Sequence, residues 1–382
     1  MMFKKIEINM INLYAFLIPC VTATRDAYGF SIGRIFLLTI AFIAIIDAMF
    51  SKKIKNNQYL LVLLFLYPLW MTCSLLWTPS NCVNQGIIRT GFTIAICVFF
   101  FLISCRDISE IELKKIKNKI IIGGVISSLL LIALGGDYYG DEEEVRYSLT
   151  PQTDPNYYSM YLLMPVALVF KAITTSTGKN KAIAVLSMII MLYAIFLCGS
   201  RGALLSIFIM LVIELVRNRR FCIIMMLLFC IYMAFDSVGE IYPRFEINTL
   251  ASGAGRSLIW TVITQMIKDN IICGVGVSGI KGVYDEYAIQ AGVGFLAGHG
   301  RDPHNAYMEI FAELGIVGFV LYTMIILVSL YNNYKYKKNN FDMSIGIVGT
   351  LIAAFFLSSV LEEAIWFYLV LLTMRIKNDE TN

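Results

Sequence analysis

The chain has 382 residues, of which 58% are hydrophobic and 15% are charged. A soluble domain carries about a quarter charged residues, so a water-soluble fold of this length could not bury so much apolar surface. The net charge of +4 is too small to indicate a nucleic-acid partner, and the informative property is where Lys and Arg lie along the chain.

Apolar segments long enough to cross a bilayer recur along the whole chain. At roughly 20 residues per crossing, the length predicts an all-α polytopic membrane protein of about 12 transmembrane helices. The first apolar run is interpreted as an uncleaved span, because no convincing small-residue cleavage site follows it. The predicted spans are 10–24, 31–50, 59–77, 86–104, 120–134, 157–170, 182–198, 203–216, 221–235, 306–331, 344–358 and 364–374.

Most of the 31 basic residues fall in every second gap between these spans. The positive-inside rule therefore places those gaps, and both chain termini, in the cytoplasm. The alternate gaps, which include the acidic GGDYYGDEEEV stretch and the CGSRG turn, then face outward. The predicted organisation is helices 1–9 in residues 1–235, a large extracytoplasmic loop in residues 236–303, and helices 10–12 in residues 304–382.

The outer segment 236–303 is the only gap large enough to carry structure of its own. Its RSLIWTVITQMIKDN stretch predicts an amphipathic helix that lies on the membrane surface or caps the bundle. The glycine-rich runs GVGVSGIKG and AGVGFLAGHG that follow predict mobile loop, and they lack the strand and helix context of a nucleotide site. The predicted apolar face of the helix consists of Leu258, Ile259, Val262, Ile263, Met266 and Ile267.

Polar and cationic residues gather at or near the predicted outer face. Because basic residues are depleted on that side, arginines there indicate compensation by carboxylates or by an anionic ligand. Glu309 and Glu313, one turn apart on a predicted span, are expected to pair with such arginines. The planar guanidinium also suits a diphosphate through bidentate contacts. The outer residues are Arg34, Arg89, Arg146, Asp154, Asn156, Arg201, Arg256, His299, Arg301 and His304.

The strongest candidates among these also have simpler interpretations. Arg201, in LCGSRGALLS, and Arg256, at the start of the amphipathic helix, are compatible with an interfacial anchor and a solvated helix end. His304, at the entrance of a span, is compatible with a hydrogen-bonded anchor as well as with a base. Asn305 is placed to cap that span.

The nine cysteines lie mostly inside apolar runs and form no CxxC pair. Such cysteines behave as small buried side chains. Only Cys82 and Cys273 fall in outer loops, and a disulfide between them is not the favoured interpretation.

The order of several motifs resembles a known family. CGSRGALL, then GRSLIW with GVGVSG, then PHNAYMEIFAELGIVG look like the signature stretch of the O-antigen ligase, polymerase and O-oligosaccharyltransferase family. LLWTPS and TDPNYYSMYLLMP are also similar to members at the corresponding spans. The resemblance covers residues 77–318, with one departure at NIICGVG, where a proline commonly precedes the glycines.

This resemblance implies a GT-C-like, inverting and metal-independent glycosyltransferase without a cofactor, whose donor is a glycan on undecaprenyl diphosphate. Carried over onto the matching motifs, Arg201 and Arg256 would hold the donor diphosphate and stabilise the leaving group. His304 would orient or deprotonate the acceptor hydroxyl. Further substrate-binding candidates are Asn305, Glu309, Asn156, Arg89 and Arg34.

The acceptor distinguishes the activities within the family. A polymerase extends another lipid-linked glycan, whereas a ligase transfers the glycan to lipid A core. Polymerase is narrowly favoured because the loops are moderate and no large soluble domain follows. A chain-length regulator and a flippase are further candidate partners, and the implied location is the bacterial inner membrane with the site facing the periplasm or exterior. A lipid-glycan flippase or transporter is the alternative from another class, but the internal repeats typical of transporters are not evident.

Overall fold

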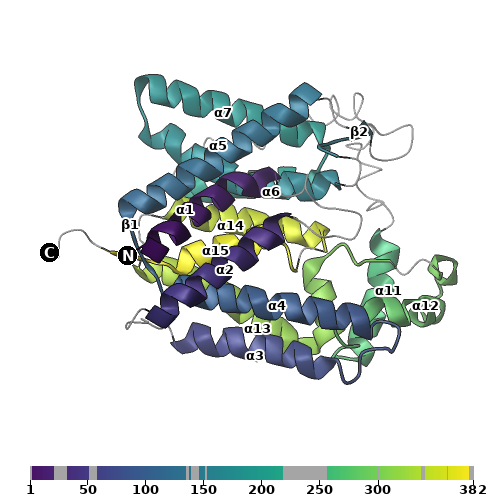
Figure 1. The fold of residues 1–382 in the computed structure, drawn as a ribbon. Helices are drawn as coiled ribbons and strands as arrows, with labels where there is room; N and C mark the ends of the chain where they lie inside the picture. Colours follow the sequence, from purple (N-terminus) through teal and green to yellow (C-terminus); the bar gives the residue numbers. More distant parts are fainter. Residues whose placement is uncertain are drawn as a thin grey trace, which may run out of the picture.

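The computed structural model is a bundle of helices that run roughly side by side (Figure 1). Residues 221–235, predicted as a span, and His299 lie outside the described part of the chain. The structure describes residues 2–20, 32–50, 58–134, 137–138, 146–150, 153–217, 256–298, 301–336, 340–358 and 360–377.

The described residues are helical apart from short strands. Strand β1 pairs in parallel with β4, and β2 pairs antiparallel with β3. The strands are β1 (Asp107–Ser109), β2 (Asp137–Tyr138), β3 (Tyr147–Ser148) and β4 (Arg375–Lys377). The helices are α1 (Met2–Leu17), α2 (Ile32–Phe50), α3 (Gln58–Ser74), α4 (Val83–Ser104), α5 (Glu110–Leu134), α6 (Pro155–Thr175), α7 (Gly178–Leu197), α8 (Arg201–Arg217), α11 (Arg256–Asp269), α12 (Ile280–Gln290), η4 (Gly294–Leu296), α13 (Ala306–Tyr336), α14 (Phe341–Ala353), η5 (Ala354–Phe356) and α15 (Glu363–Thr373).

Each predicted span that falls within the described residues overlaps one of these helices. Five helices, α4, α5, α6, α7 and α13, are each long and apolar enough to cross a membrane. The helical class of membrane protein is therefore confirmed, and the total of about 12 crossings stays a prediction.

Helix α15 lies at the centre of the bundle, and all of its residues are buried. A helix that is apolar on every side is stable only when other helices surround it. The Trp366 ring is fully buried and lies 6.0 to 6.3 Å, centroid to centroid, from the rings of Tyr67, Phe100 and Tyr322. These rings come from three different helices, so α15 joins α3, α4 and α13 into one core.

The end of the bundle that carries β1 and β4, here called the inner end, collects residues that were predicted to be cytoplasmic or close to it (Figure 1). Arg106 forms ion pairs with Asp47 (2.6 Å) and Glu7 (3.3 Å). Lys117 pairs with Asp342 at 2.8 Å. These contacts join α1, α2, α5 and α14, which are far apart in the sequence.

The opposite end, here called the outer end, carries α11 and α12 (Figure 1). Helix α11 buries Ile259, Val262, Ile263 and Met266 against α12, η4 and α13, so it caps the bundle and shares a small core there. Leu258, predicted on the same face, is 39% exposed, because it lies in the first turn, at the edge of the apolar stripe.

The prediction of loop was wrong for the end of the GVGVSGIKG run, because α12 begins at Ile280 and continues through the unassigned residues to Gln290. This helix buries Ile280, Tyr284 and Ala288, which are spaced four residues apart. That spacing is the signature of a buried helical stripe. Glycine-rich runs, which are typical of loops, flank this helix on both sides.

Helix α13 is broken at Gly315, whose φ of 63° and ψ of −167° are not helical. The break frees backbone groups that a continuous helix would pair internally, and neighbouring segments satisfy them. The turn that follows α11 supplies most of the partners, and a tryptophan of α3 supplies another. The bonds are Val275 N to Ala312 O (2.9 Å), Gly276 N to Glu313 O (2.9 Å), Ile316 N to Ile271 O (2.7 Å) and Trp70 Nε1 to Leu314 O (2.9 Å).

Glycine is required on both sides of this contact. A Cβ at Gly315 would lie 2.1 Å from Ile272 O, and one at Gly274 would lie 2.3 Å from Glu313 O. Both glycines also have positive φ, which residues with a Cβ rarely adopt. The NIICGVG turn is therefore fixed by its docking onto α13.

We expect Gly315→Ala to destabilise the protein by at least the cost of a strained left-handed residue, about 1–3 kcal/mol. Gly91→Ala in α4 is the matched control, because a Cβ there would meet nothing within 4 Å. The measurement is the thermal unfolding midpoint of each purified variant in detergent. Equal midpoints for Gly315→Ala and the wild type would contradict the proposed role of the break.

Candidate functional site

Two of the predicted site residues, His304 and Asn305, lie directly before α13 at the outer end, at the entrance of this helix. Asn305 is buried, and its Oδ1 accepts hydrogen bonds from Tyr307 N (3.0 Å) and Met308 N (3.1 Å). It caps the helix as the sequence predicted. His304 precedes it with a φ of 48°, a left-handed conformation that is uncommon outside glycine. Its backbone N donates to Ser358 Oγ at 3.1 Å, which fixes the turn.

His304 is partly buried among charged neighbours. Burial and the Arg256 guanidinium lower the pKa of His304 below its ordinary value of 6.5, and Arg301 acts in the same direction. Asp302 and Asp154 oppose this shift. The imidazole is therefore neutral, and able to accept a proton, at neutral pH.

Helix α11 is tied to the same entrance. The Trp260 indole Nε1 donates to Pro303 O at 2.9 Å, one residue before His304. Arg256 lies one turn before Trp260, in the first turn of α11, and interacts electrostatically with His304. The structure therefore brings together two of the three predicted catalytic residues, although 48 positions separate them in the sequence.

Arg201, the third, is the first residue of α8. The short helix η5, which follows α14 in the chain, packs against the starts of both α8 and α13. A Cβ at Gly202, the next residue, would lie 2.8 Å from the ring of Phe356. The neighbouring Phe355 ring lies 4.4 Å, centroid to centroid, from Tyr307 in the first turn of α13. The starts of α8 and α13 therefore pack on opposite sides of one short segment.

The start of α6 contributes a further polar group. Asp154 caps this helix by accepting from Asn156 N (2.8 Å) and Asn156 Nδ2 (2.9 Å), with Pro155 in the first helical position. Arg146 donates from Nε to Cys198 O at 3.1 Å, in the turn before α8. The predicted binding residue Asn156 is thus held within the cap of α6.

The most buried charge cluster of the outer end joins α4 to α13. Arg89 Nη1 pairs with Glu313 Oε2 at 2.7 Å, and its Nη2 pairs with Glu309 Oε1. The Ser278 backbone also hydrogen-bonds to Glu313. The predicted pairing of both carboxylates with an outer arginine is therefore confirmed, and it fixes the half of α13 that precedes the break.

Glu309 retains free acceptor capacity. Its Oε2 is buried and meets no hydrogen-bond donor that satisfies normal geometry among the described residues. Ser358, which receives the His304 N–H, lies near this carboxylate. A buried acceptor without a donor is costly, and such atoms are frequent where a substrate binds.

Arg34 is engaged in a second buried pair. Its Nε lies 3.1 Å from Glu363 Oε1, and its guanidinium carbon lies 4.5 Å from the centroid of the Phe92 ring. The Tyr161 hydroxyl lies 2.7 Å from Glu362 Oε2 and 3.0 Å from Glu363 Oε2. The contacts of Arg34 and Arg89 are thus with carboxylates of the protein, and their predicted substrate contacts stay a prediction.

Sequence reasoning missed several of these residues. Glu362 and Glu363 were not singled out, although two adjacent carboxylates at the outer start of an apolar helix are an unusual signal. Ser358 and Trp260 carry no pattern that distinguishes them from ordinary loop and helix residues. Their roles depend on contacts that only the fold creates.

Helices α6, α8, α11, α13 and α15 are among the described helices that begin at this end. The amino-terminal end of a helix carries about half a positive charge and unpaired N–H groups, which favour anions. Arginines at the starts of α8 and α11 add full positive charges. The arrangement suits an anionic group with several oxygens next to a neutral imidazole.

The fold and this site define a helical membrane protein with an anion-attracting outer end. A family model described as O-Antigen ligase matches residues 186–323, from the middle of α7 to the second half of α13. The match confirms the resemblance to the O-antigen ligase and polymerase family, and it includes Arg201, Arg256 and His304. No curated protein matched the chain at a significant level.

The described residues include no group of three or more His, Cys, Asp or Glu side chains placed to hold a metal ion. Cys82 is buried and Cys273 is exposed, and both are free thiols.

We expect Arg89→Ala to lower the free energy of unfolding by about 3–5 kcal/mol, because it leaves two buried carboxylates without their cation. Lys281→Ala is the control, since the pair of Lys281 with Asp302 is about half exposed (47% and 51%) and surface pairs contribute little. Chemical denaturation in detergent measures both. An Arg89→Ala variant as stable as Lys281→Ala would show that the buried pair does not hold α13.

Proposed function

We propose that the protein transfers glycans from a lipid diphosphate donor at the outer face of the bacterial inner membrane. The observation that carries this proposal is the convergence of Arg256, His304 and the start of α8 at one end of the bundle, within the O-antigen ligase match. The proposed reaction is an inverting, metal-independent transfer of the GT-C-like type, and it needs no cofactor.

Arg201 and Arg256 are the proposed ligands of the donor diphosphate. As the bond between the sugar and the diphosphate breaks, negative charge grows on the leaving oxygen. Guanidinium forks and helix amino termini at the starts of α8 and α11 stabilise that charge through bidentate hydrogen bonds. The undecaprenyl chain of the donor would lie in the surrounding lipid.

His304 is the proposed acceptor base. Its lowered pKa keeps the imidazole neutral at periplasmic pH, and its left-handed backbone and bond to Ser358 hold it at the entrance of α13. Glu309, with one carboxylate oxygen free to accept a hydrogen bond, is the proposed ligand of an acceptor hydroxyl. Asn305 at the same entrance and Asn156 at the start of α6 are further proposed substrate-binding residues.

Arg89 and Arg34 remain proposed substrate-binding residues, and their ion pairs support an additional positioning role. Arg89 orients Glu309 directly through its guanidinium. Arg34 holds Glu363 at the start of α15. Both arginines would act on the substrate mainly through the carboxylates they fix.

Polymerase is the first proposed activity and ligase is the second. A polymerase acceptor is chemically like its donor, so one membrane-level site suits both substrates. The family description favours a ligase, which would transfer the glycan to lipid A core. A flippase or transporter is the alternative from another class of protein. It is disfavoured because the charge clusters described above lie towards the ends of the bundle rather than at its middle.

The proposed topology has both termini in the cytoplasm and the cap formed by α11 and α12 outside. The ion pairs of Arg106 and Lys117 support it, because they join residues at or next to gaps that the positive-inside rule places in the cytoplasm. A chain-length regulator and a flippase are proposed partners, as is the surrounding membrane lipid.

The decisive assay uses the purified protein in nanodiscs with an undecaprenyl-diphosphate-linked oligosaccharide and EDTA. A polymerase should produce a ladder of longer lipid-linked glycans without further additions. A ligase should form product only after lipid A core is added. Absence of product under both conditions, with activity restored by a divalent cation, would reject metal-independent transfer. Absence under all conditions would reject the transferase proposal.

We expect Arg201→Lys and Arg256→Lys each to reduce turnover strongly, because lysine keeps the charge but loses the bidentate fork. One lost charge-assisted hydrogen bond corresponds to roughly a 10- to 100-fold loss of rate. Lys268→Arg, a charge-conserving change at the other end of α11, is the control. Normal glycan products from both arginine variants would show that these residues anchor their helices at the membrane surface and do not bind the diphosphate.

We expect His304→Ala to lose about 10² to 10⁴ in rate while donor binding is kept. His299→Ala, the change at the second of the two histidines, is the control. In the wild-type profile of rate against pH, the midpoint of the acid limb should lie below pH 6.5, because a lowered His304 pKa keeps the base neutral to lower pH. Arg301→Gln removes a charge that lowers this pKa, so its acid limb should move upward. A wild-type rate in His304→Ala would exclude the base role.

A further inference from the structure

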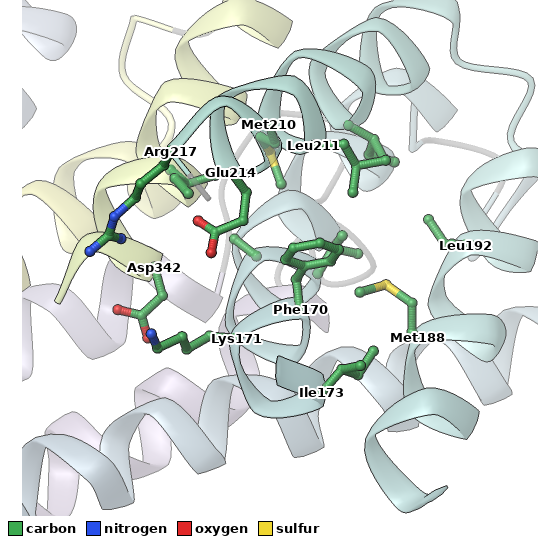
Figure 2. A pocket seen from close by; sticks show the side chains of 14 residues that line it. Phe170, Lys171, Ile173, Met188, Leu192, Met210, Leu211, Glu214, Arg217 and Asp342 are labelled. Carbon is green, nitrogen blue, oxygen red and sulfur yellow. The ribbon is translucent and has the colours of Figure 1, made fainter. Parts of the chain in front are cut away.

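A second feature lies near the inner end of the bundle, away from the candidate site. Helices α6, α7, α8 and α14 enclose a cavity of about 180 Å³. Figure 2 shows its two parts, with charged side chains gathered at one end and apolar side chains lining the rest. The apolar lining consists of Val166, Ala167, Phe170, Ile173, Met188, Leu192, Ile207, Met210, Leu211 and Ile345.

The length of the cavity matches one leaflet of a bilayer. Its lining on α8 extends from Ile207 to Arg217, a rise of about 15 Å at 1.5 Å per residue. This is half of the roughly 30 Å hydrocarbon thickness of a membrane. At about 180 Å³ the cavity suits part of a single acyl chain and is too small and too apolar for a glycan.

The cavity also lies close to the lipid. Met188 and Leu192 of α7 line it, whereas Ile189 on the same helix is 57% exposed. One helix therefore separates the cavity from the bilayer. A chain can enter between α7 and α8, which are joined at their outer ends by the short turn before Arg201.

The charged end carries a surplus of cations. Lys171, Glu214, Arg217 and Asp342 line it. Asp342 is already held by Lys117, whose Nζ lies 2.8 and 2.9 Å from its two oxygens. Lys171 and Arg217 thus outnumber the remaining carboxylate. The guanidinium carbon of Arg217 lies 3.9 Å from the centroid of the Phe341 ring, a stacking contact that holds this cation beside the cavity.

We infer that this cavity binds an anionic phospholipid of the inner leaflet, with one acyl chain between α7 and α8 and the phosphate at Lys171 and Arg217. A charged head at the membrane surface and an apolar chain at hydrocarbon depth match the two parts of the cavity. The site is separate from the proposed glycan transfer, and its test does not depend on that activity.

The probe is phosphatidylglycerol with a photoactivatable diazirine in one acyl chain, incorporated into nanodiscs with the full-length protein. Illumination and peptide mapping should place crosslinks on Met188, Leu192, Met210 and Leu211. Unlabelled phosphatidylglycerol should compete, and phosphatidylcholine should compete about tenfold less well, because its choline cation offsets the phosphate charge and is repelled by Lys171 and Arg217. Competition by undecaprenyl phosphate in preference to phosphatidylglycerol would overturn the assignment in favour of a polyprenyl chain.

Two pairs of variants separate the cavity from the general lipid surface. Leu192→Trp should fill the cavity and remove its crosslinks, whereas Ile189→Trp on the exposed face should keep them. Arg217→Gln should abolish the preference for phosphatidylglycerol, whereas Lys179→Gln, an exposed cation at the amino-terminal end of α7, should not. Gel filtration and thermal unfolding verify folding. Equal crosslinking in Leu192→Trp and Ile189→Trp would overturn the proposal. Crosslinks of the wild-type protein at residues outside the cavity would also overturn it.

Discussion

A single buried guanidinium, Arg89, holds the outer half of α13 in place. It joins α4 to two carboxylates one turn apart, and removal of either charge would leave the other uncompensated in an apolar setting. The same carboxylates face Ser278 and the entrance where His304 lies. The position of the proposed acceptor base therefore depends on an ion pair at the outer end of the bundle.

The break at Gly315 makes this arrangement possible. A continuous α13 would satisfy its own backbone, and the turn after α11 would have no partners to dock against. Because the helix breaks there, Val275 and Gly276 bond to carbonyls of its first half and Ile316 bonds back to the same turn. The cap that carries Arg256 is thus attached through backbone hydrogen bonds, which fix its position more rigidly than apolar contact would.

The two ends of the bundle have different chemistry. The outer end gathers the starts of several helices, with arginines and a neutral imidazole, which suits an anionic group undergoing reaction. The cavity near the inner end combines an apolar lining with the cations Lys171 and Arg217, which suits a bound amphiphilic lipid that undergoes no reaction. Helices α6 and α8 contribute to both, so lipid bound near one end and substrate bound at the other would contact the same two helices.

The sequence by itself determined the helical class, the positions of the described spans and the Asn305 cap. These features depend on local hydrophobicity, periodicity and side-chain chemistry, which neighbouring positions encode. Only the tertiary structure decided that Arg89 pairs with Glu313, 224 positions away, that Arg34 pairs with Glu363, and that Gly315 breaks α13. Each of these depends on which helices pack together, because a buried charge or a freed carbonyl takes its partner from whichever segment the fold brings beside it.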